Sequence, residues 1–124
     1  MTIRRHTVSL TSAVGATGTA YSPYISGFIE SIQYVKTDYA DGVDFTITAE
    51  ATGETIWTQA DVNAAVIVYP RAATHSTAGV ASLFAAAGEA VTDRIALGRD
   101  RVKIAIAQAG GTKTGTFVIT VSDR

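Results

Sequence analysis

Three carboxylates that lie close together are the first candidates for chemistry. Asp38, Asp41 and Asp44 surround Gly42, and carboxylate oxygens are the ligands that Ca²⁺ prefers. A helical calcium loop, however, places its ligands at alternating positions and ends on a bidentate Glu, and this segment does neither. Because Asp and Gly also favour turns, we interpret the segment as a polar turn between strands, with a bound ion as the minor alternative.

Two histidines, His6 and His75, are the candidate acid–base groups. A Ser-His-Asp site needs a nucleophile within hydrogen-bond reach of an oriented base, and no serine lies in a Gly-x-Ser-x-Gly elbow. Residues 110–115 combine Gly, Lys and Thr, but a phosphate loop has a different spacing and opens a helix, whereas a strand pattern follows here. The sequence therefore predicts no enzyme, no cofactor and no catalytic residue.

Aromatic side chains could line a platform for a carbohydrate or a peptide, because their faces offer a large contact area at low entropic cost. Most of the candidates lie within or beside strand patterns, where packing across strands is the more common role. A carbohydrate-binding module, which needs an exposed aromatic pair, is therefore kept as an alternative function. The candidates are Tyr21, Tyr24, Tyr34, Tyr39, Tyr69 and Trp57.

Strands are the elements that must position these residues. The chain of 124 residues contains 12 Val, 11 Ile and 18 Thr but only 3 Leu, and β-branched side chains favour the pleated strand over the helix. A net charge of −1 argues against an electrostatic nucleic-acid binder, and no apolar run is long enough to predict a membrane span. Because the chain has no cysteine, packing or partners must hold the fold together.

Alternation of apolar and polar residues recurs along the chain and predicts a single domain over residues 1–124. Short strands separated by frequent turns favour an all-β fold, an antiparallel β-sandwich that is jelly-roll-like or partly closed as a barrel. We expect about seven or eight strands and at most one short helix. The clearest strand patterns fall in residues 5–11, 28–35, 45–49, 55–58, 66–68, 91–97, 102–106 and 116–121.

The sequence also predicts how some of these elements connect. The strands within residues 28–58 are expected to form a three-stranded meander, and Gly110-Gly111 is expected to close a hairpin between the last two strands. Residues 1–6 are expected to form an N-terminal arm. The Ala-rich residues 74–90 fit either one short helix, which Ser76 or Thr77 would begin and Gly88 would end, or an ordered loop.

Four segments of the sequence carry a resemblance to a known family. They are ESIQYVKTDYADGVDFTITAEATGETIW at residues 30–57, RAATH at 71–75, DRIALGRDRVKIAIA at 93–107 and KTGTFVITV at 113–121. Together they extend over most of the chain, which resembles small proteins encoded among the structural genes of tailed bacteriophages and prophages. The resemblance implies a virion component, and it carries no catalytic residues.

On this basis we expect a capsid decoration or cement protein that stabilises contacts between major capsid subunits in the virion. It would act as a homo-oligomer, expected to be a trimer, and would bind neither nucleic acid nor membrane. The alternative within the same class is a head-tail joining, neck or tail accessory protein. The expected contacts lie in the N-terminal arm and in an irregular interaction loop at residues 69–90, and the residues that we expect to make them are Arg4, Arg5, His6, Tyr69, Arg71 and His75.

Overall fold

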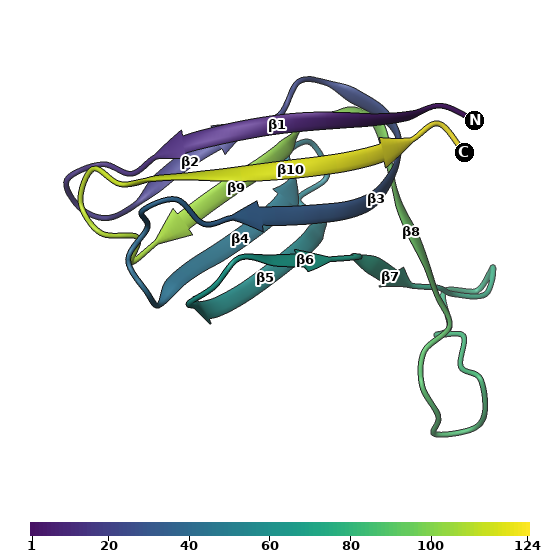
Figure 1. The fold of residues 1–124 in the computed structure, drawn as a ribbon. Helices are drawn as coiled ribbons and strands as arrows, with labels where there is room; N and C mark the ends of the chain where they lie inside the picture. The colour runs from purple at the N-terminus through teal and green to yellow at the C-terminus, as the bar shows by residue number, and fades with distance from the viewer.

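The computed structural model describes all residues from 1 to 124 and contains ten strands and no helix. Antiparallel strands form two sheets packed face to face, so the predicted all-β sandwich is confirmed (Figure 1). No helix that is long and apolar enough to cross a bilayer is present. The strands are β1 (Ile3–Thr11), β2 (Gly18–Tyr21), β3 (Ile25–Val35), β4 (Val43–Ala49), β5 (Thr55–Val62), β6 (Val66–Val68), β7 (Arg71–Ala73), β8 (Thr92–Asp100), β9 (Val102–Ala107) and β10 (Thr114–Ser122).

The larger sheet, which we call sheet A, has the strand order β1-β10-β3-β8-β7. β8 pairs with the first half of β3 and β6 pairs with the second half, so both strands lie along the same edge of β3. The smaller sheet, sheet B, has the order β2-β9-β4-β5. The two chain termini lie side by side at one end of sheet A, because Ile3 at the start of β1 pairs with Ser122 at the end of β10 (Figure 1).

The core lies between the two sheets and consists of the inward-pointing half of each alternating pattern. In β10, Phe117 and Ile119 are fully buried while the residues beside them are half-exposed. Phe45 lies among the core aromatic rings, with centroid distances of 4.8 Å to Tyr34, 5.3 Å to Trp57 and 5.0 Å to Phe117. All three contacts are edge-to-face, an arrangement that stabilises aromatic pairs beyond simple burial.

Two predicted connections are wrong. β3 and β4 are consecutive in the chain but lie in different sheets, so residues 28–58 form no three-stranded meander, and only β4 and β5 pair. β9 and β10 also lie in different sheets, so Gly110-Gly111 belongs to a crossover and not to a hairpin. Alternation shows which face of a strand is buried. Both sheets bury one face against the same core, and the pattern therefore does not say which sheet a strand joins.

Of the two segments expected outside the strands, residues 1–6 differ from expectation, and residues 74–90 follow one of their two predicted alternatives. Residues 1–6 are not a free arm, because Ile3 to His6 belong to β1 and pair with β10 from Ser122 to Ile119. Residues 74–90 form the ordered loop and not the helix. An isolated helix is marginal in water unless it packs against a core, and this segment projects away from the core. The strand count exceeds the expected seven or eight because β2 and β7, with only four and three residues, leave little alternation in the sequence.

Two buried tyrosines differ in one hydrogen bond. The Tyr39 hydroxyl donates to the Leu10 carbonyl, whereas the Tyr34 hydroxyl has no partner. A hydrogen bond contributes about 1 kcal/mol to stability, and an unsatisfied buried group costs about 1–3 kcal/mol. We therefore expect Tyr39→Phe to lower the free energy of unfolding by about 1 kcal/mol and Tyr34→Phe to raise it by a similar amount. Urea denaturation measures both changes, and a shift of the same sign in both variants would contradict this difference.

The same two tyrosines make stability depend on pH in the alkaline range. Burial raises the pKa of both phenols above 10.0. In the unfolded chain the tyrosine phenols titrate near pH 10. The neutral phenols therefore make their full contribution to the free energy of unfolding below pH 10. This contribution is lost as the pH rises through the raised native pKa values. We expect the urea midpoint to fall above pH 10 and to fall less in a Tyr34→Phe/Tyr39→Phe double variant. An identical decline in both proteins would show that other groups cause it.

Candidate interaction surfaces

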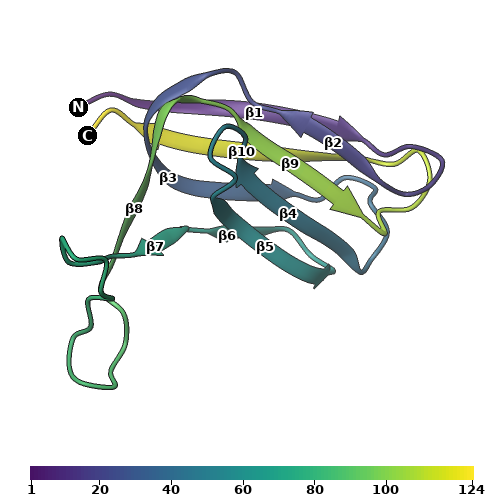
Figure 2. The ribbon, with the colours of Figure 1, turned by 180° about the vertical axis from the view of Figure 1, so that it is seen from behind.

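The most prominent surface feature is an arm formed by residues 74–91, which projects from one end of the sandwich. β7 and the first residues of β8 leave the sandwich as an antiparallel pair, with Arg71 opposite Arg94 and Ala73 opposite Thr92. The chain between them continues outward and does not return to the core in either view (Figure 1, Figure 2). The arm is therefore a protrusion that the sandwich core does not cover.

Backbone hydrogen bonds give the arm a defined shape. The amide of Thr74 donates to the carbonyl of Val91 at 2.9 Å, the amide of Val91 to Ser82 at 2.9 Å, and the amide of Ser82 to Thr74 at 3.0 Å. This ring of bonds is a junction from which two loops extend, residues 75–81 and residues 83–90, each closed by a β-bridge between its end residues. Because the arm makes these bonds internally, little further ordering is needed when a partner binds it.

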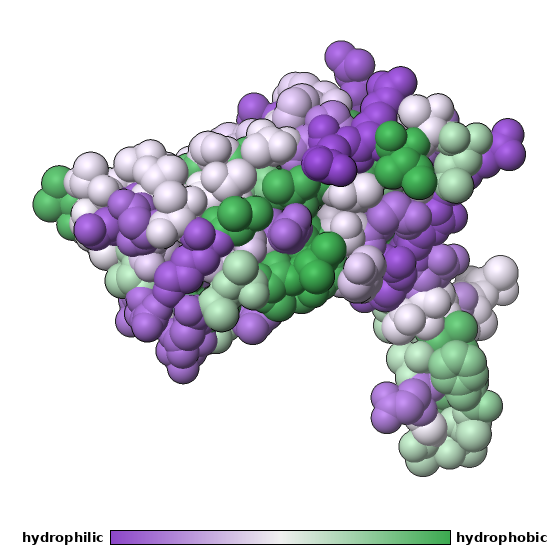
Figure 3. Space-filling view, in the orientation of Figure 1, coloured by the Kyte–Doolittle hydropathy of each residue, from purple (hydrophilic) through white to green (hydrophobic).

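The loops of the arm expose apolar side chains. Val80, Leu83 and Phe84 are 65%, 44% and 76% exposed, and alanines surround them in the sequence. Apart from His75, the only ionisable side chain of the arm is Glu89. Figure 3 shows the arm as a largely green projection beside the sandwich. Exposed apolar patches of this kind mark sites of interaction.

Arginine contacts hold the base of the arm against the sandwich. The Arg71 guanidinium donates to the carbonyls of Glu30 at 3.2 Å and Pro70 at 2.8 Å. Arg94 Nη1 lies 3.5 Å from Glu30 Oε1, and the Arg94 guanidinium stacks over the Phe28 ring at 4.4 Å. Arg71, which the sequence predicted as a partner contact, is thus engaged within its own chain and orients the arm.

The outer face of sheet A is a second surface. Two neighbouring rows of outward-pointing residues across its strands contain no charged side chain, and we call these rows the uncharged face. One row is Thr7, Val118, Gln33 and Ile67, and the next is Ser9, Thr116 and Val35. Within them, Val35 and Ile67 are 38% and 48% exposed. White and green residues accordingly extend across the middle of this side of the molecule (Figure 3).

The outer face of sheet B has a different composition. Asp44 on β4 and Lys103 on β9 point outward there, between the buried residues of their strands. Depletion of charge distinguishes the core of a protein interface from the rest of the surface. The uncharged face therefore has the composition of a covered surface. Sequence reasoning missed it, although the threonines that alternate through β10 around Val118, with no Lys or Glu among them, were a visible signal.

The three aspartates of the predicted polar turn do not form a common site. Each carboxylate binds a different partner: the Thr114 amide for Asp38, Lys36 for Asp41, and the Asp61 amide for Asp44. No group of three or more His, Asp or Glu side chains in the structure could hold a metal ion. The Asp38 bond joins the β3–β4 crossover to β10, the Asp41 contact stays within that crossover, and the Asp44 bond joins β4 to β5 within sheet B.

The predicted contact residues occupy separate parts of the fold. His6 lies in β1 opposite Ile119 and is half-buried, whereas His75 lies at the first bridge of the arm and is exposed. Tyr69 is exposed just before the base of the arm. The structure therefore does not bring the two histidines together.

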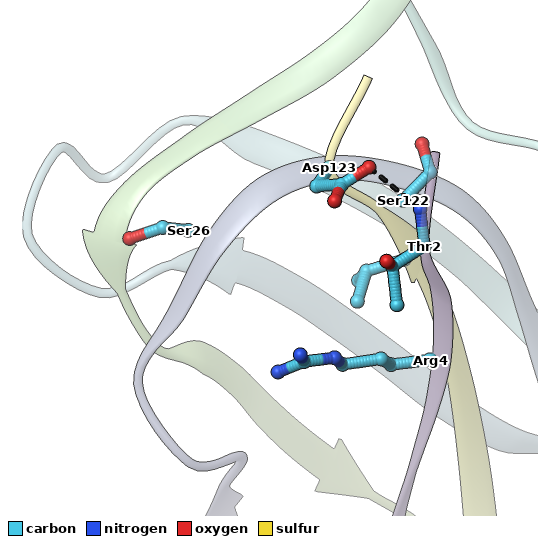
Figure 4. Close-up of a pocket in the computed structure, with 6 residues that line it drawn as sticks. Thr2, Arg4, Ser26, Ser122 and Asp123 are labelled. Carbon is cyan, nitrogen blue, oxygen red and sulfur yellow. Dashed lines mark hydrogen bonds between the residues drawn. The ribbon is translucent and has the colours of Figure 1, made fainter.

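Arg4 lines a small pocket near the two termini. The cavity has a volume of about 140 Å³ and is lined by Thr2, Arg4, Ser26, Val121, Ser122 and Asp123. The Asp123 carboxylate accepts a hydrogen bond from the Thr2 amide at 2.8 Å, which holds the pKa of Asp123 below its ordinary value. Figure 4 shows the Arg4 side chain extending from β1 along one side of this cavity. Arg5 belongs to the opposite face of the strand and pairs with Thr120.

The aromatic candidates divide into buried and exposed residues. Trp57, the largest of them, is only 8% exposed and belongs to the core. Tyr21 and Tyr24 are exposed, and the Arg101 guanidinium lies 4.2 and 5.3 Å from their ring centroids. Arg101 also forms a two-point ion pair with Glu50, which lowers the pKa of the Glu50 carboxyl. The Arg101 guanidinium therefore already lies over the exposed rings of Tyr21 and Tyr24.

The fold and its surfaces define an all-β sandwich with a protruding apolar arm. No protein-family model matches the sequence, and no curated protein matches it.

Proposed function

We propose that this chain is a structural protein of a bacteriophage virion, a capsid decoration protein that stabilises contacts between major capsid subunits. The observation that carries the proposal is the arm, which holds Phe84 in solvent although the sandwich has a complete core without it. A partner that covers the arm removes this apolar surface from water, which is favourable. The resemblance of the sequence to phage structural proteins provides the setting.

The mechanism is the burial of complementary surface between subunits. A standard interface buries about 800 Å² on each partner, and binding to folded subunits stabilises the assembled shell by mass action. Arg4 and Arg5, both exposed near the chain termini, supply cations for the rim of such an interface. No reaction centre takes part in this mechanism.

A head-tail joining or neck protein is the second candidate, and the arm is the observation that favours it. A subunit that reaches over its neighbour with a protrusion makes a heterologous contact, and repeated contacts of this kind close into a ring when the rotation allows. A ring is the form expected of a neck or tail component. The two candidates share the same surfaces and differ in the number of copies per particle.

The number of copies in purified particles tests the proposal and separates the two positions. Quantitative mass spectrometry against the major capsid protein provides this number. We expect on the order of hundreds of copies for a decoration protein, whereas about six or twelve would place the chain in a neck or tail ring. Its absence from particles would contradict both candidates. Binding of the purified protein to a glycan array would instead support the carbohydrate-binding alternative.

A further inference from the structure

We infer that the arm of one copy packs on the uncharged face of a second copy of this chain. The inference deepens the proposed structural function and rests on it for the setting in which copies meet. The contact itself joins two identical chains and needs no other virion protein. It pairs the two surfaces of the molecule that its own fold leaves without a partner.

The two surfaces match in their lack of charge. The arm carries one carboxylate, Glu89, and the two rows of the uncharged face carry no charged side chain. Covering an unpaired charge with apolar groups is costly. An apolar arm on the outer face of sheet B would cover Asp44 and Lys103, whereas on the uncharged face it would meet Val35, Val118 and Ile67. Sheet A offers the wider uncharged area, two neighbouring rows, whereas sheet B has one such row, formed by Thr58, Thr46, Ala105 and Thr19.

The arm cannot cover the uncharged face of its own chain. It leaves the sandwich where β7 and the first residues of β8 separate from the edge of β3, and it points away from β1 and β10 in both views (Figure 1, Figure 2). Arg71 and Arg94 fix its base through their contacts with Glu30, Pro70 and Phe28. The contact must therefore form between two chains.

The size of the arm suits a stable contact. A standard interface uses about 800 Å² and roughly 20 to 30 residues from each partner. The protruding segment with its base, residues 69–91, contains 23 residues. Phe84 alone exposes on the order of 150 Å², and it is the largest side chain available to anchor the contact.

The contact is heterologous because the arm and the uncharged face are different surfaces. After two copies join, one still offers a free arm and the other a free face. Further copies add until the rotation between neighbours closes a ring. A closed ring is also the arrangement in which every arm and every face is covered.

Two variants, each of which damages one surface, test the inference. Phe84→Asp places a charge on the arm, and Gln33→Glu places a charge of nearly the same shape in the middle of the uncharged face. Both positions are exposed, so each variant should have the melting temperature of the wild type when both are measured at a concentration too low for self-association. The matched controls are Val14→Asp, in a loop at a side chain that is 89% exposed, and Gln59→Glu, on the edge strand of sheet B.

Light scattering and native mass spectrometry over a concentration series measure self-association. We expect the wild type and both controls to form the same oligomer, and Phe84→Asp and Gln33→Glu each to associate more than tenfold more weakly. An equimolar mixture of these two variants is expected to form a one-to-one dimer. In that mixture the intact arm of the Gln33→Glu chain meets the intact face of the Phe84→Asp chain.

Three outcomes would overturn the inference. One is a wild-type protein that stays monomeric. If that monomer also floats with neutral phosphatidylcholine vesicles, the result would assign the arm to a lipid surface. Another is oligomerisation that neither variant weakens. The third is a mixture that forms no dimer, which would indicate that like surfaces meet. A monomeric chain that is nevertheless present in particles refutes this contact alone, and an oligomeric chain that is absent from particles refutes the proposed function alone.

Discussion

Gly115→Ala is expected to prevent folding or to lower the free energy of unfolding by at least about 3 kcal/mol. The Tyr39 ring lies directly over Gly115, and an added Cβ atom would sit 2.2 Å from Tyr39 Cε2. The ring cannot move aside easily, because it is buried and its hydroxyl donates to the carbonyl of Leu10, the residue that pairs with Gly115 across β1 and β10. Urea denaturation followed by Trp57 fluorescence measures the loss.

Gly98→Ala is the matched control for this substitution. Gly98 lies in β8, and no atom of another segment lies within 4 Å of the position that its Cβ would occupy. We expect this variant to differ from the wild type by no more than about 0.5 kcal/mol. If Gly115→Ala proved equally well tolerated, the Tyr39 ring could not pack on Gly115 as described.

Phe45→Ala is expected to lower the free energy of unfolding by about 3–5 kcal/mol, the usual cost of truncating a buried phenylalanine. Phe45 is 1% exposed and contacts Tyr34, Trp57 and Phe117 edge to face. Its removal leaves a cavity between the two sheets that the surrounding rings fill only in part. Thermal and urea denaturation both report the change.

Phe84→Ala is the matched variant at an exposed phenylalanine. Because the Phe84 side chain packs on no core residue, we expect the free energy of unfolding of the Phe84→Ala monomer to stay within about 0.5 kcal/mol of that of the wild-type monomer. Self-association should nevertheless weaken, since the anchor of the arm is lost. A destabilisation as large as that of Phe45→Ala would mean that the arm contributes to the fold and does not project from it.

The alternation of residues was sufficient to predict the strands and the sandwich, because burial of one face imposes a period of two. In residues 102–106 and 116–121 the buried side chains are the apolar ones of the pattern. The assignment of strands to sheets could not be predicted in the same way. β3, β4, β9 and β10 each bury one face against the same core, whichever sheet they belong to.

The surfaces depend on arrangements that local sequence does not encode. The arm lies almost wholly within residues 69–90, expected as an irregular loop, but its shape comes from the ring of bonds among Thr74, Ser82 and Val91, residues that no local pattern connects. The uncharged face combines residues from four strands. Only the register of β1, β10, β3 and β6 places Thr7, Val118, Gln33 and Ile67 side by side.

Incorporation of the Phe84→Asp variant into particles tests the central claim most directly. Particles are produced in cells that supply either this variant or Val14→Asp in place of the wild type, and mass spectrometry measures the number of copies per particle. We predict that Val14→Asp is present at the wild-type number and that Phe84→Asp is absent, although both proteins have the wild-type melting temperature at concentrations too low for self-association. Phe84→Asp present at the wild-type number would contradict the claim that this chain works through its arm.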